Sequence, residues 1–131
     1  ASATNLVPNV PTLRRKTLAV VGGVSTIIDQ EIAPGVENLQ VQLGIDVDQD
    51  NTVDRYVNVG DDIYDPSAAG FVPGARVITA RIWLVVRGQS IEPGVQDSRD
   101  YEPGDVDLGT YSDDFRRLQV SKTILLRNAR T

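Results

Sequence analysis

Five oxygen-bearing residues at alternate positions of one short segment are the part of this sequence best suited to chemistry. They are Asp46, Asp48, Asp50, Thr52 and Asp54. These are positions 1, 3, 5, 7 and 9 of an EF-hand-like calcium loop, in which alternating oxygens curl round a hard cation. Asn51 stands where glycine is expected, and Val57 stands where a bidentate carboxylate belongs, although Asp61 or Asp62 could complete the shell. The spacing predicts a calcium loop, and the alternative is a solvated acidic turn, because Asp and Asn favour turns.

The sequence contains few of the residue types that catalytic sites use. The chain has no cysteine and no histidine, which removes thiol nucleophiles, imidazole bases and the usual zinc ligands. Asp113 with Asp114, or Asp105 with Asp107, could supply the two carboxylates of a glycosidase. One Trp and four Tyr are few for a carbohydrate cleft. We therefore predict that the protein is not an enzyme.

Composition limits the remaining classes of function. A formal net charge of -5 and a sequence pI near 4.6 disfavour a nucleic-acid partner, because such proteins gain affinity by neutralising phosphates. No stretch approaches the roughly 18 apolar residues of a membrane span. The length of 131 residues suits one compact domain. The start lacks hydrophobic periodicity, which predicts a flexible N-terminal segment over residues 1–12 and a single β domain over residues 13–131.

Alternating apolar residues indicate several strands along the chain. Stretches of this kind occupy residues 16–21, 24–30, 39–45, 76–87 and 115–126. The Gly22-Gly23 pair is typical of a two-residue hairpin turn, and at most a short turn of helix is expected near residues 33–39. Short loops and the lack of crossover helices predict a mainly β fold, an antiparallel sheet of about five to seven strands.

The strand at residues 76–87 has two different faces. The more apolar face, which we expect to be the core face, carries Ile78, Ala80, Ile82, Leu84 and Val86. On the other face Arg81 and Trp83, together with Arg117 from the last strand, could form a cation–π surface that binds a partner. The long polar loop over residues 88–112 is of a length that is usually functional or mobile.

Three segments, taken together, resemble a known family. They are residues 35–46, with Gly35-Val36-Glu37-Asn38-Leu39-Gln40 at the start, residues 77–87, with Arg81-Ile82-Trp83-Leu84, and the closing residues 116–128. An acidic turn leading to Asp54-Arg55-Tyr56 lies between the first two. In residue identity, order and spacing they resemble the PilW family of type IV pilus minor pilins, and more distantly the minor pseudopilins of type II secretion. The resemblance covers roughly residues 11–128.

The resemblance implies an assembly function. It identifies the chain as a pilin-like head domain that lacks its N-terminal helix, so that the full-length protein would be α+β and reach the membrane only through that helix. The implied partners are other minor pilins, the major pilin and a tip adhesin. The implied role is initiation and tip assembly of the pilus, in an extracytoplasmic location that is anchored in the inner membrane before assembly. The alternative, from the residues alone, is a calcium-dependent adhesion or carbohydrate-binding β-module that binds through residues 46–54.

Overall fold

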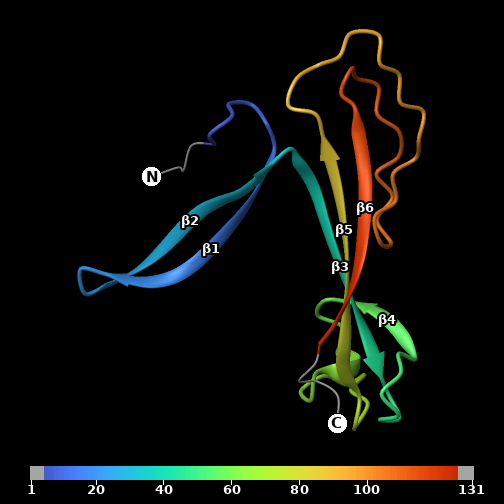
Figure 1. The fold of residues 1–131 in the computed structure, drawn as a ribbon. Coiled ribbons are helices and arrows are strands. Elements are labelled where there is room, and N and C mark those ends of the chain that lie inside the picture. Colours follow the sequence, from blue (N-terminus) through green and yellow to red (C-terminus); the bar gives the residue numbers. More distant parts are fainter. Residues whose placement is uncertain (1–4, 127–131) are drawn as a thin grey trace.

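The computed structural model describes residues 5–126, and its regular structure is almost entirely β-strand (Figure 1). The elements are β1 (Thr12–Val21), β2 (Val24–Pro34), β3 (Val36–Asp46), β4 (Arg55–Asn58), the 3-10 helix η1 (Asp62–Tyr64), β5 (Arg76–Arg87) and β6 (Arg117–Leu125). Every strand pair is antiparallel. The predicted mainly β fold is therefore confirmed. None of the described residues forms a helix long and apolar enough to cross a bilayer.

The predicted hairpin forms, and it is longer than expected. Gly22 and Gly23 have φ values of +57° and +81°, and two successive positive φ values are what a tight hairpin turn needs. Val21 pairs with Val24, and the pairing continues to Thr12 opposite Pro34. β1 and β2 thus form a two-stranded hairpin that extends away from the rest of the molecule (Figure 1).

A bend at Gly35 separates this hairpin from a four-stranded sheet with the order β4-β3-β5-β6. Gly35 has a φ of +93°, and a Cβ there would lie 2.7 Å from the carbonyl oxygen of Arg87. Its amide donates to the Pro11 carbonyl at 2.7 Å, and its carbonyl accepts from the Arg87 amide at 2.8 Å. The helical turn expected near residues 33–39 is wrong, because strands occupy both sides of this bend. The expected single sheet is divided in two for the same reason.

The two faces of the four-stranded sheet are covered unequally. The loop of residues 88–116, which we call the covering loop, lies against the face that carries Trp83. A Cβ at Gly104 would lie 3.6 Å from the Trp83 ring. Val85 on the same face is fully buried, and Tyr101 of the covering loop is 2% exposed. The long polar loop is thus a packed layer over the sheet.

The opposite face was expected to be the core, and this expectation is largely wrong. Only its end at Ile78 is buried. Farther along, side chains of β5 and β6 line an open hollow of about 400 Å³, among them Ile82, Leu84, Val120 and Ile124. Together with Leu39, which is 43% exposed and pairs with Leu84, these four residues form what we call the open sheet face. Alternation shows which side chains share a face, but it carries no information on what covers that face.

We expect Gly44→Ala to destabilise the domain by about 3 kcal/mol, the upper end for overpacking a close contact. Gly44 lies opposite Thr79, and a Cβ there would be 2.0 Å from the Thr79 hydroxyl oxygen and 3.0 Å from Val53 Cγ2. Gly88→Ala is the matched control, because its Cβ would meet nothing closer than 3.5 Å. Urea denaturation measures both, and equal midpoints for the two variants would contradict the prediction.

Candidate functional site

The acidic residues that the sequence singles out lie at one end of the sheet, in the connection from β3 to β4. We call residues 46–54 the acidic loop. Asp46 is the last residue of β3 and pairs with Arg76, the first residue of β5. Arg76 donates to Asp46 Oδ2 from Nε at 3.1 Å and from Nη2 at 2.9 Å. The strand pairing therefore fixes one fully buried carboxylate at the start of the loop.

The remaining members of the predicted calcium loop hold its shape. Asp48 Oδ1 accepts the Asp50 amide at 3.2 Å, and Asp50 Oδ1 accepts the Thr52 amide at 2.8 Å and its hydroxyl at 2.6 Å. Asp54 Oδ2 accepts the amide of Val47 at 2.7 Å, which ties the two ends of the loop together. Asp46, Asp48 and Asp50 each place one oxygen within 4.8 Å of the others. Of the five predicted ligands, these three converge.

The charges of these carboxylates act on one another. Burial raises the pKa of Asp46, but the interactions with Arg76 and with the amides of Asn51 and Gln49 outweigh it, so the pKa lies below its ordinary value. For Asp48, a hydrogen bond from the Asp50 amide lowers the pKa. Burial and the neighbouring negative charges of Asp50, Asp54 and Asp46 together raise the pKa by more than this hydrogen bond lowers it, so the net shift is upward. Hydrogen bonds from the Thr52 hydroxyl and amide lower the pKa of Asp50, so Asp48 is the one of these three aspartates at which the neighbouring negative charges raise the pKa overall.

The three residues predicted to bind a partner do not form one surface. Arg81 lies 3.8 Å from the ring centre of Tyr56 and 5.8 Å from that of Trp83, so the expected cation–π contact is present. Arg117 lies at the other end of the β5–β6 pairing, opposite Arg87, and it is 3% exposed. Its guanidinium is therefore packed inside the domain.

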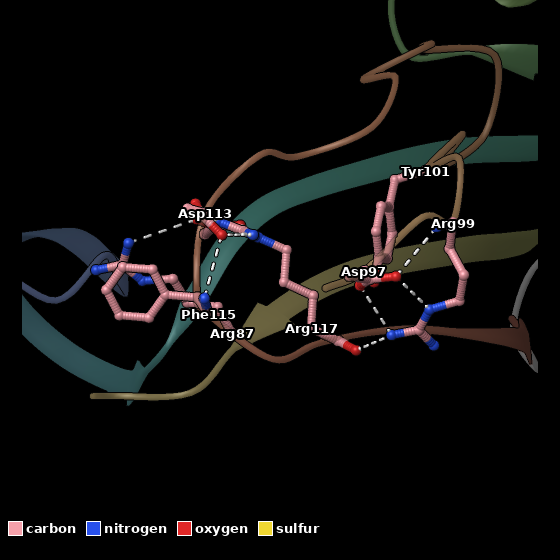
Figure 2. A network of polar contacts seen from close by, with 8 residues as sticks. Arg87, Asp97, Arg99, Tyr101, Asp113, Phe115 and Arg117 are labelled. Carbon is pink, nitrogen blue, oxygen red and sulfur yellow. Dashed lines mark hydrogen bonds and ion pairs between the residues drawn. The ribbon is translucent and has the colours of Figure 1, made fainter. Parts of the chain in front are cut away.

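Arg117 is the centre of a polar network that fastens the covering loop to the sheet (Figure 2). Its guanidinium donates to Glu37 of β3 at 2.7 and 3.1 Å, and to both oxygens of Asp113 at 2.6 and 2.7 Å. The ring of Tyr111 lies 3.7 Å from the same guanidinium. The hydrogen bonds to Asp113 and then Glu37 raise the pKa of Arg117. This cation joins β6, β3 and the covering loop.

A second group extends the network at the other side of Arg117. Arg99 donates to Asp97 at 2.9 and 3.0 Å, and it also donates to the backbone carbonyl of Arg117. The Tyr101 hydroxyl donates to the same carboxylate of Asp97. The hydrogen bonds from Arg99 and Tyr101 hold the pKa of Asp97 well below its usual range. Sequence reasoning missed this network because the partners have no regular spacing.

Apolar side chains on the hairpin are exposed to solvent, whereas the sequence analysis placed both of its strands in one sheet with the others. Leu18 pairs with Ile27, and Val20 lies two residues beyond Leu18 on the same side of β1. They are 72%, 60% and 73% exposed, respectively. Such apolar residues on a protruding element are typical of surfaces that bind other proteins.

A family model described as PilW, type IV pilus-assembly protein W, matches residues 1–128. The chain belongs to the PilW family. No curated protein and no solved structure gives a significant match to it. Membership in the PilW family places the chain in type IV pilus assembly, in the cell envelope or the pilus, with components of pilus assembly as partners. PilW proteins are generally structural rather than enzymatic.

We expect Arg117→Ala to destabilise this PilW domain by about 3 kcal/mol, because it leaves the carboxylates of Glu37 and Asp113 without their buried partner. Arg116→Ala is the matched control. The Arg116–Glu92 ion pair is exposed, at 69% and 49%, and such pairs contribute less than about 1 kcal/mol. Chemical denaturation of both variants measures the difference, and equal losses of stability would show that Arg117 is not the central tie.

Stability at high pH tests the position of Tyr101. Burial and the hydrogen bond to Asp97 raise the pKa of Tyr101 to about 12, against about 10 in an unfolded chain. Its contribution to stability is therefore complete below pH 10 and is lost as the pH rises toward 12. We expect the stability difference between the native protein and Tyr101→Phe to shrink over this range. A difference that stays constant from pH 9 to about 12 would contradict the buried hydroxyl.

Proposed function

We propose that this chain is the head domain of a minor pilin, which takes part in initiation and tip assembly of a type IV pilus. Its partners in this proposal are other minor pilins, the major pilin and a tip adhesin. Family membership supports the role in pilus assembly, and the protruding apolar hairpin supports direct contact with a neighbouring subunit. The chemistry is surface complementarity between folded subunits.

The hairpin is the observation that carries this proposal. An isolated two-stranded hairpin is marginally stable in water, and this one turns Leu18, Val20 and Ile27 toward solvent. Burial of one such side chain at an interface stabilises it by about 1.5–3 kcal/mol. A neighbouring pilus subunit that covers these three residues would both hold the hairpin and gain affinity from it.

The open sheet face offers a second apolar surface. Val120 and Ile124 are each 40% exposed beside Ile82 and Leu84. Among residues 5–126, β6 pairs only with β5, which leaves its outer edge for contacts with another chain. Two separate apolar surfaces suit a subunit that must contact more than one neighbour.

We do not propose the alternative function of a carbohydrate-binding module. The ring of Trp83 is packed beneath Gly104, and the guanidinium of Arg81 covers the ring of Tyr56. Each of these two rings is therefore covered on one side by another part of the domain, which disfavours them as an open stacking surface for a sugar.

The paired substitution Leu18→Ser and Ile27→Ser tests the role of the hairpin. In the full-length protein, expressed in its piliated host, we expect at least a tenfold loss of surface pili, because the lost burial weakens subunit contacts by several kcal/mol. The thermal stability of the purified head should change little, since exposed positions contribute within about 0.5 kcal/mol.

The matched control for this pair is Thr17→Ser with Thr26→Ser. These residues lie on the other face of the same hairpin, opposite Ile28 and Ala19. Pilus number, counted by electron microscopy, should stay at the native level in the control. Normal piliation with the Leu18 and Ile27 variant would argue against the hairpin as an assembly surface.

A further inference from the structure

The acidic loop gathers three carboxylates round one point. Asp46, Asp48 and Asp50 each contribute one oxygen to a group whose members lie within 4.8 Å of one another. Gln49 and Asn51 adopt positive φ values of 63° and 69°. These left-handed residues alternate with the carboxylates and curl the backbone around them. An acidic cluster alone does not define a site, so a second observation is needed.

That observation is an oxygen atom of Asp46. The residue is fully buried. Its Oδ2 accepts hydrogen bonds from Arg76 and from the Asn51 amide, at 2.9–3.1 Å. Its Oδ1 is also buried and accepts no well-aligned hydrogen bond, although the Gln49 amide interacts with this carboxylate and helps to lower its pKa. A buried polar atom without a partner destabilises a fold by about 1–3 kcal/mol, and more if it is charged.

The position of this oxygen points to a cation. Because Oδ2 is occupied by Arg76 and Asn51, Oδ1 is the oxygen of Asp46 left for the cluster with Asp48 and Asp50. A hydrogen-bond donor would satisfy one such oxygen, but three carboxylates that converge also repel one another. A divalent cation at their centre satisfies the buried oxygen and removes the repulsion together.

We propose that the acidic loop binds Ca²⁺ through the side chains of Asp46, Asp48 and Asp50. The backbone carbonyl of Thr52 supplies position 7, and Asp54, whose carboxylate lies outside the converging group, acts at position 9 through a bridging water, as is often the case in calcium loops. The Thr52 hydroxyl is already bonded to Asp50, which leaves its carbonyl for the metal. This site is independent of the assembly function.

The ligand set favours Ca²⁺ over Mg²⁺. All donors are oxygen atoms on a flexible loop, which suits the six to eight ligands and variable geometry of Ca²⁺, whereas Mg²⁺ requires a near-ideal octahedron. Val57 occupies the position of the usual bidentate carboxylate, so water must supply the missing ligands. We therefore expect a weak site, with a Kd of about 10⁻⁴ to 10⁻³ M, in the range of extracellular calcium modules.

Calorimetric titration and thermal unfolding of the 131-residue chain with CaCl2 test the site. With Ca²⁺ about tenfold above its Kd, Tm should rise by about 3–6 °C relative to EDTA. MgCl2 at the same concentration should give less than half of that shift. No heat of binding and no shift in Tm at about 10 mM Ca²⁺, tenfold above the weakest expected Kd, or an equal shift with MgCl2, would overturn the proposal.

Matched variants separate this site from a general effect of acidic residues. Asp50→Asn removes one charge but keeps the acceptor for Thr52, and it should weaken Ca²⁺ binding at least tenfold. Asp65→Asn is the control, because Asp65 Oδ1 accepts the amide and hydroxyl of Ser67 at 2.9 and 2.7 Å in the same kind of turn. Asp48→Asn serves as a second test at a position that makes a single 3.2 Å hydrogen bond to the loop backbone.

Native-like Ca²⁺ binding by Asp50→Asn and Asp48→Asn would overturn the proposed ligand set. Equal loss of binding in Asp65→Asn would overturn it too, since Asp65 lies outside the cluster.

Discussion

The buried guanidinium of Arg117 is the interaction on which the rest of this structure depends. A cation that is 3% exposed is tolerated only when carboxylates surround it. Glu37 comes from β3 and Asp113 from the covering loop, so the pairing draws a long, polar segment onto the sheet. Arg99 of the same segment also donates a hydrogen bond to the backbone carbonyl of Arg117 (Figure 2). The covering loop is ordered because this charge has to be neutralised.

As a result, one face of the four-stranded sheet is covered by the covering loop, and two apolar surfaces, the open sheet face and the hairpin, are left exposed. The covering loop buries Val85 and packs on Trp83, while the open sheet face has no comparable layer among the described residues. The bend at Gly35 sends the hairpin away from the sheet, where Leu18 and Val20 stay exposed. Both surfaces suit a subunit that is completed by its neighbours, which agrees with membership in a family of pilus-assembly proteins.

The sequence was a good guide wherever the signal was local. Alternation located the strands, and Gly22-Gly23 located the hairpin turn, because period-two patterns and positive φ depend on a few adjacent residues. The family resemblance, carried by three ordered segments, is confirmed over residues 1–128. Asp46, Asp48 and Asp50 of the predicted calcium loop lie close together, and calcium binding by that loop stays a prediction. The flexible segment over residues 1–12 and the single domain over residues 13–131 stay predictions.

Features that depend on contacts between residues far apart in the chain could not be predicted from the sequence. The Arg117–Glu37 pair joins residues 80 positions apart, and no periodicity relates them. Alternation grouped Ile82 with Leu84 correctly but could not show that the covering loop would lie on the other face. The division into two sheets depends on the carbonyl of Arg87 meeting Gly35, which is again a contact between distant segments.

The central claim is that the apolar face of the hairpin contacts another pilus subunit. A photoreactive amino acid at Leu18 of the full-length protein, irradiated in piliated cells, tests it most directly, with the same probe at Thr17 on the opposite face for comparison. The account predicts that Leu18 cross-links to another pilus-assembly component, and that Thr17 does so far less. Cells that assemble normal pili while Leu18 cross-links to no other subunit would contradict it.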